Sequence, residues 1–193
     1  MIGLNALRAV SRTSSPLFFF CVSVAWSAGA QHISPGVAIG VAAPIGDLGR
    51  ERSPGPVTQI YAVIGKPDRI AEFQITGEGV WFHGKAAPTS LTSSAYGNLR
   101  ILSLLGSLLI APVLDDVKPY LSLGAGLQAL NIQGRQNPYG RLIGVRSGVG
   151  IELPLRKISI RAEVSAHAVL SDFGTGHDYS FGTYIPATVA IQF

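Results

Sequence analysis

The stretch Tyr184-Ile-Pro-Ala-Thr-Val-Ala-Ile-Gln-Phe193 alternates between two kinds of side chain. One parity is apolar throughout, from Ile185 to Phe193, and the other carries the more polar series from Tyr184 to Gln192. A period of two predicts a β-strand with one apolar face. We expect such a strand, ending on an aromatic residue, in a closed membrane barrel. There the final strand pairs with the first, and its last residue sits at a lipid–water boundary.

Residues 1–30 have the features of a cleavable export signal. Arg8 and Arg12 form a basic start, residues 17–26 are apolar, and the small residues 27–30 predict cleavage before Gln31. The alternative is an uncleaved anchor, but the apolar segment is about half the ~20 residues that a spanning helix needs. We therefore expect a signal peptide at 1–30 and one barrel domain at 31–193.

The composition is unusual for a soluble domain. Charged residues make up 13% of the chain and the mean hydropathy is +0.35, whereas soluble domains carry roughly 25% charged residues. The most apolar run, 101–114, is interrupted by serine, glycine and proline, so no membrane helix is predicted. The single cysteine, Cys21, lies in the signal, which excludes disulfides and thiolate sites from the mature chain. Basic residues form no cluster, so nucleic acid is not an expected partner.

Turn residues divide the mature chain into eight segments with strand periodicity. The predicted strands are 33–43, 56–65, 70–82, 98–112, 119–130, 141–153, 158–169 and 184–193. Connections alternate between short (66–69, 113–118, 154–157) and long (44–55, 83–97, 131–140, 170–183). This predicts an all-β fold, an eight-stranded antiparallel up-and-down transmembrane β-barrel. The leucines of 98–112 fit neither period well, which leaves a short buried helix open there.

The polar faces of these strands are rich in small residues and carry few charges. A water-facing exterior would carry many more lysines and glutamates, so we expect the polar face to line the lumen. An eight-stranded barrel has room there only for side chains, and buried charges require partners. The predicted polar lumen network comprises Glu72, Glu78, Arg146, Glu152, Arg161, Glu163 and His167. A soluble lipid-binding barrel, with the opposite orientation, is the alternative.

Aromatic residues gather near the predicted strand ends, as in the interfacial girdles of membrane barrels. The girdle is predicted to contain Phe73, Trp81, Tyr96 and Tyr139. Tyr120 and Tyr184 fall on the inward parity instead.

Three segments resemble the small eight-stranded outer-membrane barrels of the OmpA/OmpX-like group. They are Lys118-Pro-Tyr-Leu-Ser-Leu-Gly-Ala-Gly126, Gly148-Val-Gly-Ile-Glu-Leu153 and Val189-Ala-Ile-Gln-Phe193. The resemblance implies a location in the bacterial outer membrane and contact with its lipids. It also implies that the barrel-assembly machinery reads Phe193 as an assembly signal. We expect a monomer.

Candidate chemistry is sparse, and the sequence predicts no catalytic site, no metal site and no cofactor. Ser165 and His167 share a face, and some small outer-membrane barrels are lipid A deacylases or acyltransferases that use serine and histidine for catalysis. The inward parity of His167 and the sequence of 167–171 disfavour that alternative. His177-Asp178 is too common a pair to indicate a metal. The expected function is non-enzymatic: a structural, adhesion or envelope-integrity role through the extracellular loops.

Overall fold

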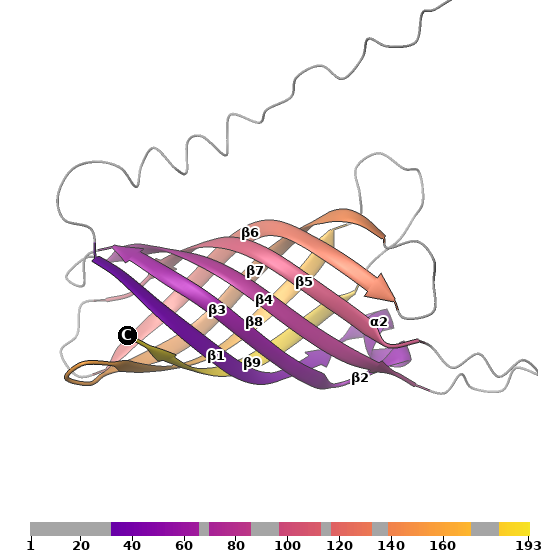
Figure 1. Cartoon of the computed structure of the whole chain (residues 1–193), viewed down its shortest axis with the longest axis horizontal. Helices are drawn as coiled ribbons and strands as arrows, with labels where there is room; N and C mark the ends of the chain where they lie inside the picture. The colour runs from indigo at the N-terminus through magenta and orange to yellow at the C-terminus, as the bar shows by residue number, and fades with distance from the viewer. Residues whose placement is uncertain (1–31, 66–69, 86–96, 113–116, 133–138, 171–181) are drawn as a thin grey trace, which may run out of the picture. The chain divides into compact units, whose positions relative to one another are not determined.

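The computed structural model describes residues 32–65, 70–85, 97–112, 117–132, 139–170 and 182–193 (Figure 1). Its eight long strands are β1 (His32–Pro44), β3 (Gly55–Gly65), β4 (Ala71–Gly84), β5 (Leu99–Ile110), β6 (Lys118–Ile132), β7 (Tyr139–Pro154), β8 (Ser159–Leu170) and β9 (Thr183–Gln192). A short helix, α2 (Gly46–Glu51), and a two-residue strand, β2 (Arg52–Ser53), follow β1. The export signal predicted at 1–30 lies outside the described residues, as does Gln31.

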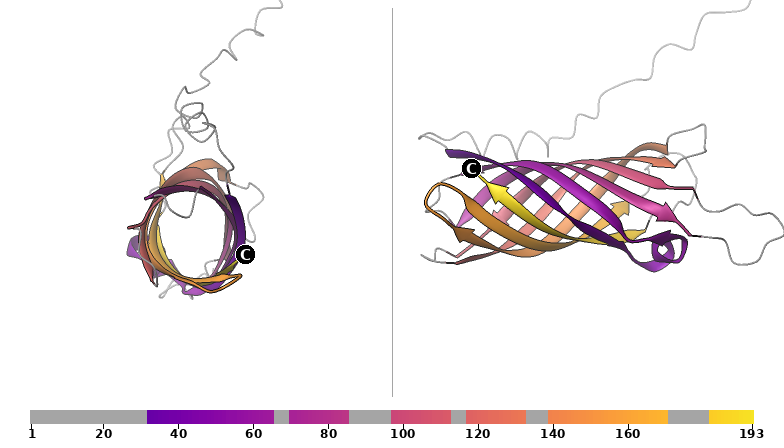
Figure 2. Two further views of the ribbon diagram at one scale, coloured as in Figure 1. Left: turned by 90° about the vertical axis from the view of Figure 1, so that its left-hand side faces the viewer. Right: turned by 60° about the horizontal axis from the view of Figure 1, so that its bottom comes forward.

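The eight long strands form one closed antiparallel sheet. Each pairs with the next along the chain, and the ring closes where β1 pairs with β9, from Gly36 opposite Gln192 to Pro44 opposite Tyr184. Seen end-on, the strands surround a single axis (Figure 2). The predicted fold class is therefore confirmed, and every predicted strand boundary lies within two residues of the observed one.

The segment for which the sequence left a short helix open forms strand β5. Residues 99–110 alternate between buried and exposed along their whole length, so the short buried helix is wrong. Leu105 and Leu109 point into the barrel, whereas Leu102, Leu104 and Leu108 are exposed on its outer wall. The period was hidden because leucines occupy both faces of this strand.

Helix α2 and strand β2 lie in a connection that the sequence marked as an irregular loop. The helix places Leu48 against buried apolar residues of the barrel. Its Gly49 carbonyl accepts a hydrogen bond of 2.6 Å from the Lys85 ammonium. The pairing of Arg52 with Gly84 extends β4 beyond the ring. A six-residue helix with two glycines has too little periodicity to stand out in a sequence.

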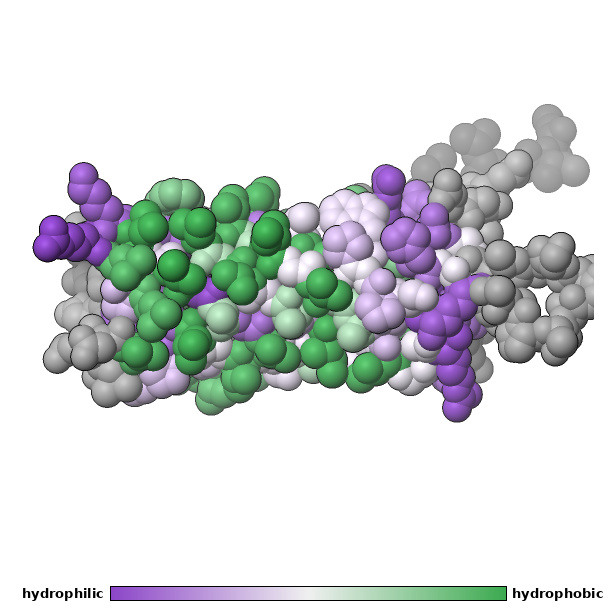
Figure 3. Space-filling view, turned by 90° about the horizontal axis from the view of Figure 1, so that it is seen from below, coloured by the Kyte–Doolittle hydropathy of each residue, from purple (hydrophilic) through white to green (hydrophobic). Residues whose placement is uncertain are grey.

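The outer wall of the barrel is apolar. The large hydrophobic side chains exposed on it include Val37, Ile39, Val41, Ile60, Leu102, Leu104, Leu108, Leu121, Leu123, Leu127, Val149, Val164 and Val189. Figure 3 shows hydrophobic side chains covering much of one side of this wall, with hydrophilic ones gathered towards its two ends. Within the described residues, no helix is long and apolar enough to cross a membrane.

Two apolar clusters close the interior. The larger one, at the α2 end, contains Ala42, Val57, Val80, Phe82, Leu99, Ile101, Leu130, Leu142, Val169 and Tyr184. The smaller one, at the end that carries Phe193, contains Ala38, Tyr61, Val63, Leu109, Tyr120 and Ala190. The sequence analysis did not anticipate these clusters. They confine the polar interior to the middle of the barrel.

Candidate functional site: the polar network of the lumen

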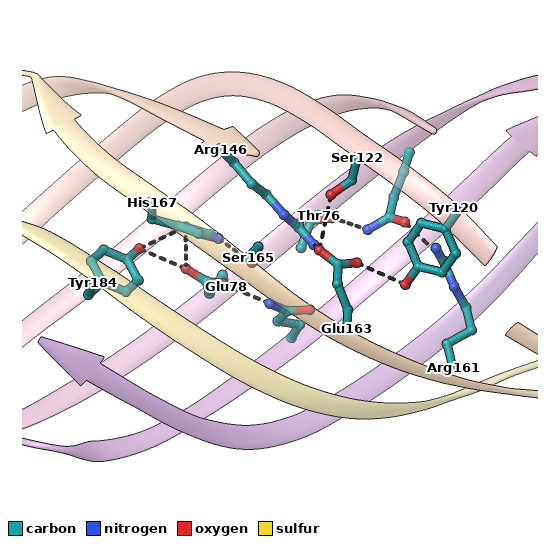
Figure 4. A network of polar contacts seen from close by, with 12 residues as sticks. Thr76, Glu78, Tyr120, Ser122, Arg146, Arg161, Glu163, Ser165, His167 and Tyr184 are labelled. Atoms are coloured by element: carbon teal, nitrogen blue, oxygen red, sulfur yellow. Dashed lines mark hydrogen bonds and ion pairs between the residues drawn. The ribbon is translucent and has the colours of Figure 1, made fainter. Parts of the chain in front are cut away.

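Polar side chains fill the barrel between the two apolar clusters. They come from inward positions of seven strands, and the buried ones include Gln59, Gln74, Thr76, Glu78, Ser122, Arg146, Arg161, Glu163, Ser165 and His167. These residues occupy alternate positions along their strands, and the pleat of a strand directs the side chains at alternate positions to the same face, here the lumen. Burial of charge at these positions requires hydrogen-bonding or ionic partners. Figure 4 shows how these partners converge on the axis.

Glu163 of β8 is the centre of one half of the network. Its carboxylate is ion-paired with Arg146 of β7 and accepts hydrogen bonds from Tyr120 Oη (2.9 Å) and Ser122 Oγ (3.1 Å). Partners from two strands, β6 and β7, thus converge on this one carboxylate of β8 (Figure 4). Gly148 leaves the required space, because a Cβ there would lie 2.8 Å from Glu163 Oε1. Charge-assisted bonds of this kind are among the stronger ones in proteins.

Arg161 lies towards the Phe193 end of the lumen. Its guanidinium carbon is 4.4 Å from the centre of the Tyr120 ring and 5.3 Å from that of Tyr61, distances suited to cation–π contact. Arg161 Nη1 donates to Gln74 Oε1 at 3.1 Å and to Gln192 Oε1 at 3.3 Å. The side chain therefore ties β8 to β4 and β9 across the barrel.

Glu78 organises the other half of the network, nearer α2. Tyr184 Oη donates to Glu78 Oε1 at 2.9 Å, and Gln59 Nε2 donates to Oε2 at 2.7 Å. His167 Nδ1 lies 3.1 Å from Tyr184 Oη and 3.4 Å from Glu78 Oε1. Ser165 Oγ is 3.1 Å from His167 Nε2.

The order Ser165–His167–Glu78 has the connectivity of a serine-hydrolase triad, with the hydroxyl on one imidazole nitrogen and a carboxylate near the other. Its surroundings are unlike those of a working triad. Ser165, His167 and Glu78 are 4%, 0% and 4% exposed, so a substrate carbonyl has no path to Ser165 Oγ. Tyr184 Oη also contacts Nδ1, the nitrogen that faces the carboxylate in a triad. The geometry suits a static hydrogen-bonded chain.

The predicted network residues divide into a buried and a peripheral group. Glu78, Arg146, Arg161, Glu163 and His167 are all buried in the lumen. Glu152 lies at the edge, with Oε2 3.9 Å from Arg161 Nε. Glu72 is half-buried and lines a hollow of about 540 Å³ at the Phe193 end, together with Glu152 and Lys118.

Sequence reasoning omitted Tyr120, Tyr184 and the glutamines from the network. The inward parity of both tyrosines was visible, and a buried phenol needs a partner for its hydroxyl. That combination was the available signal. The glutamines gave no signal beyond their inward parity, because their partners are set by contacts across the barrel.

The predicted girdle residues are only partly described. Phe73 and Trp81 are half-buried on the outer wall. Tyr139 begins β7, but its side chain lies outside the described part, as does the whole of Tyr96. Phe193 is 60% exposed, and its backbone N–H donates to the Pro35 carbonyl at 2.9 Å. His177 and Asp178 also lie outside the described residues. Within the described ones, no group of three potential ligands could hold a metal ion.

Comparisons with solved structures identify the fold. Neisserial surface protein A superimposes with a TM-score of 0.63 at 14% identity, over 85% of this chain and 98% of that one. The N-terminal β-barrel domain of Pseudomonas aeruginosa OprF gives 0.50 at 11% identity, over 86% and 100%. The chain thus has the fold of small eight-stranded outer-membrane barrels. No family model and no curated protein sequence matches it.

We predict that Glu163→Ala lowers the free energy of unfolding by about 3–5 kcal/mol, because it leaves the Arg146 charge buried without its partner. The matched control, Glu152→Ala, should cost roughly 0–1 kcal/mol, since its ion pair is long and at the edge. Urea unfolding of the purified barrel in detergent micelles measures both. If Glu163→Ala does not fold, Glu163→Gln keeps the acceptor oxygen and should lose less. Equal costs for the two alanine variants would contradict the assigned role of Glu163.

Proposed function

We propose that this protein is an integral barrel of a bacterial outer membrane, without enzymatic activity, and that it acts through its loops. The observation that carries the proposal is the orientation of the wall: apolar side chains face outward, and charged pairs are sealed inside. In hydrocarbon every backbone polar group needs an internal partner, and a closed sheet supplies one. The closure between β1 and β9 meets that requirement.

The same orientation argues against the soluble lipid-binding barrel. Such a barrel holds its ligand in an apolar interior and presents polar residues to water. Here Leu104, Leu123 and Ile39 are more than half exposed, whereas Arg146 and Glu163 are buried. A soluble protein with this wall would expose a continuous apolar patch and aggregate.

The long connections support the assignment of the proposed role to the loops. Small outer-membrane barrels carry short periplasmic turns and longer extracellular loops. The connections of β1 to β3, β4 to β5 and β8 to β9 leave from the α2 end, which would therefore face outward. The filled lumen supports a scaffold rather than a pore. The proposed role is adhesion or envelope integrity, with no cofactor and with the barrel as a monomer.

Phe193 is proposed as the residue by which the assembly machinery recognises the terminal strand. Its side chain is exposed and directly follows Gln192, the last residue of β9. Because the strand that ends here also closes the ring with β1, its recognition would position the last pairing step.

A charge on the wall should test the membrane proposal. Leu104 lies near the middle of β5 and faces outward, so Leu104→Arg should lower the free energy of unfolding from phosphatidylcholine vesicles by about 2–4 kcal/mol. The control is Leu155→Arg in the β7–β8 turn, where an exposed leucine precedes β8 and the cost should be near zero. Wild-type barrel should migrate differently on gels before and after boiling. Recovery in the soluble periplasmic fraction without detergent would refute membrane residence.

Absence of hydrolysis is tested at Ser165. Since Ser165 is buried and small, Ser165→Ala should leave the barrel folded and the acyl pattern of lipid A unchanged. Mass spectra of lipid A from cells that express wild type, Ser165→Ala or neither provide the comparison. A deacylated species that appears with wild type and disappears with Ser165→Ala would show an enzyme.

Truncation tests the proposed assembly signal. Deletion of Phe193 should reduce the amount of heat-modifiable barrel in outer-membrane fractions, while the barrel refolded from urea into detergent stays closed. Ile191→Ala serves as a control for loss of apolar area near the end of β9. Undiminished membrane yield from the truncated chain would remove Phe193 from this role.

A further inference from the structure

Four polar or amphipathic side chains lie side by side on the outer wall near α2. Trp81 of β4 is opposite Arg100 of β5, and Arg100 is opposite Asn131 of β6. His83 is the next outward residue of β4 and is exposed. We call Trp81, His83, Arg100 and Asn131 the rim cluster. Together with Phe82, Asn98 and Leu99 they line a hollow of about 390 Å³.

Arg100 carries an exposed positive charge that makes no ion pair with any described residue. No carboxylate is among the residues that line the hollow. The other outward positions of β5 are Leu102, Leu104, Gly106, Leu108 and Ile110. The guanidinium therefore stands where the apolar wall ends, and its charge lacks a counter-ion from the described part of the chain.

The side chain of Trp81 indicates the depth of Arg100 in the membrane. Its indole lies against Gly79 on the same outer face, since a Cβ on Gly79 would come within 2.8 Å of the ring. The ring thus extends from the strand position opposite Arg100 towards the apolar wall. Tryptophan prefers the level of lipid head groups, so Arg100 should reach the phosphates.

We infer that the rim cluster binds the phosphate of an outer-leaflet lipid, specifically the phosphorylated glucosamine head group of lipid A. A guanidinium matches phosphate with two parallel hydrogen bonds. The amide of Asn131 and the ring of His83 can donate further hydrogen bonds, and Trp81 offers an apolar surface to the sugar and the first acyl carbons. This inference rests on the proposed outer-membrane location.

The hollow at the Phe193 end supports no comparable inference. It is lined by carboxylates, Glu72 and Glu152, as well as by cationic Lys118 and Arg161. Mixed charge of this kind favours neither an anionic nor a cationic ligand. The rim cluster, in contrast, has one sign of charge and borders the apolar wall.

The test measures lipid that stays bound after extraction. Full-length wild type and Arg100→Gln are refolded into phosphatidylcholine vesicles that contain bisphosphorylated lipid A and are then extracted in mild detergent. Lipid A per barrel is counted by mass spectrometry. Arg100→Gln should retain about fivefold less, the factor that corresponds to ~1 kcal/mol for one basic residue at an anionic lipid surface. Arg156→Gln, an exposed arginine in the β7–β8 turn, is the matched control and should retain as much as wild type.

Each outcome bears on one proposal. Equal retention by wild type and Arg100→Gln overturns the inference, and so does equal retention of lipid A with its phosphates removed. Release of lipid A by competing inorganic phosphate would show that the site recognises free phosphate and would overturn the assignment to lipid. The gel mobility of every sample before and after boiling is recorded. Loss of that shift in wild type would refute membrane residence, whereas a retained shift with equal retention refutes only the lipid site.

Discussion

The pairing of β1 with β9 is the constraint on which the rest of this structure depends. Without it, the sheet would have two open edges, each with a row of unpaired N–H and C=O groups. With it, nine register pairs from Gly36–Gln192 to Pro44–Tyr184 join the first and last strands of the barrel. Closure defines an inside and an outside, and the two-residue period of each strand then sends alternate side chains to each. The apolar wall and the polar lumen both follow from this one pairing.

The charged groups in the interior need polar partners, whereas the apolar side chains of the outer wall do not. Charged groups such as Glu163, Arg146 and Glu78 are stable there because each is held by partners from other strands. Apolar clusters flank this network at both ends, although Arg161 also lines the hollow at the Phe193 end. A buried polar network in which many groups lack hydrogen-bond partners makes a protein less stable than an apolar core would. This explains how a triad-like contact, Ser165 to His167, can be structural: the hydrogen bonds around it also hold the three strands β4, β8 and β9 together.

The proposed function resides on the surfaces of the barrel. Because buried side chains fill the middle of the lumen, we propose that recognition takes place at the rim and the connections. The rim cluster around Arg100 illustrates how a small departure from the apolar pattern produces a distinct surface. One cation at the end of an otherwise apolar strand marks the boundary between two environments. The similarity to other small barrels shows the fold, and such folds carry different functions.

The amino-acid sequence by itself determined the number of long strands, their approximate ends and which face of each is apolar. These features are local, because a period of two and turn residues are read within ten residues of chain. It also placed Glu163, Arg146 and His167 on the inward face. Only the tertiary structure decided which polar side chains are hydrogen-bonded to each other. Tyr120 is bonded to Glu163, 43 residues away in the sequence, and Tyr184 to Glu78, 106 residues away. It also decided that Leu105 fills the lumen while Leu104 faces outward. Such choices depend on the register of eight strands around a closed ring, which no single strand encodes.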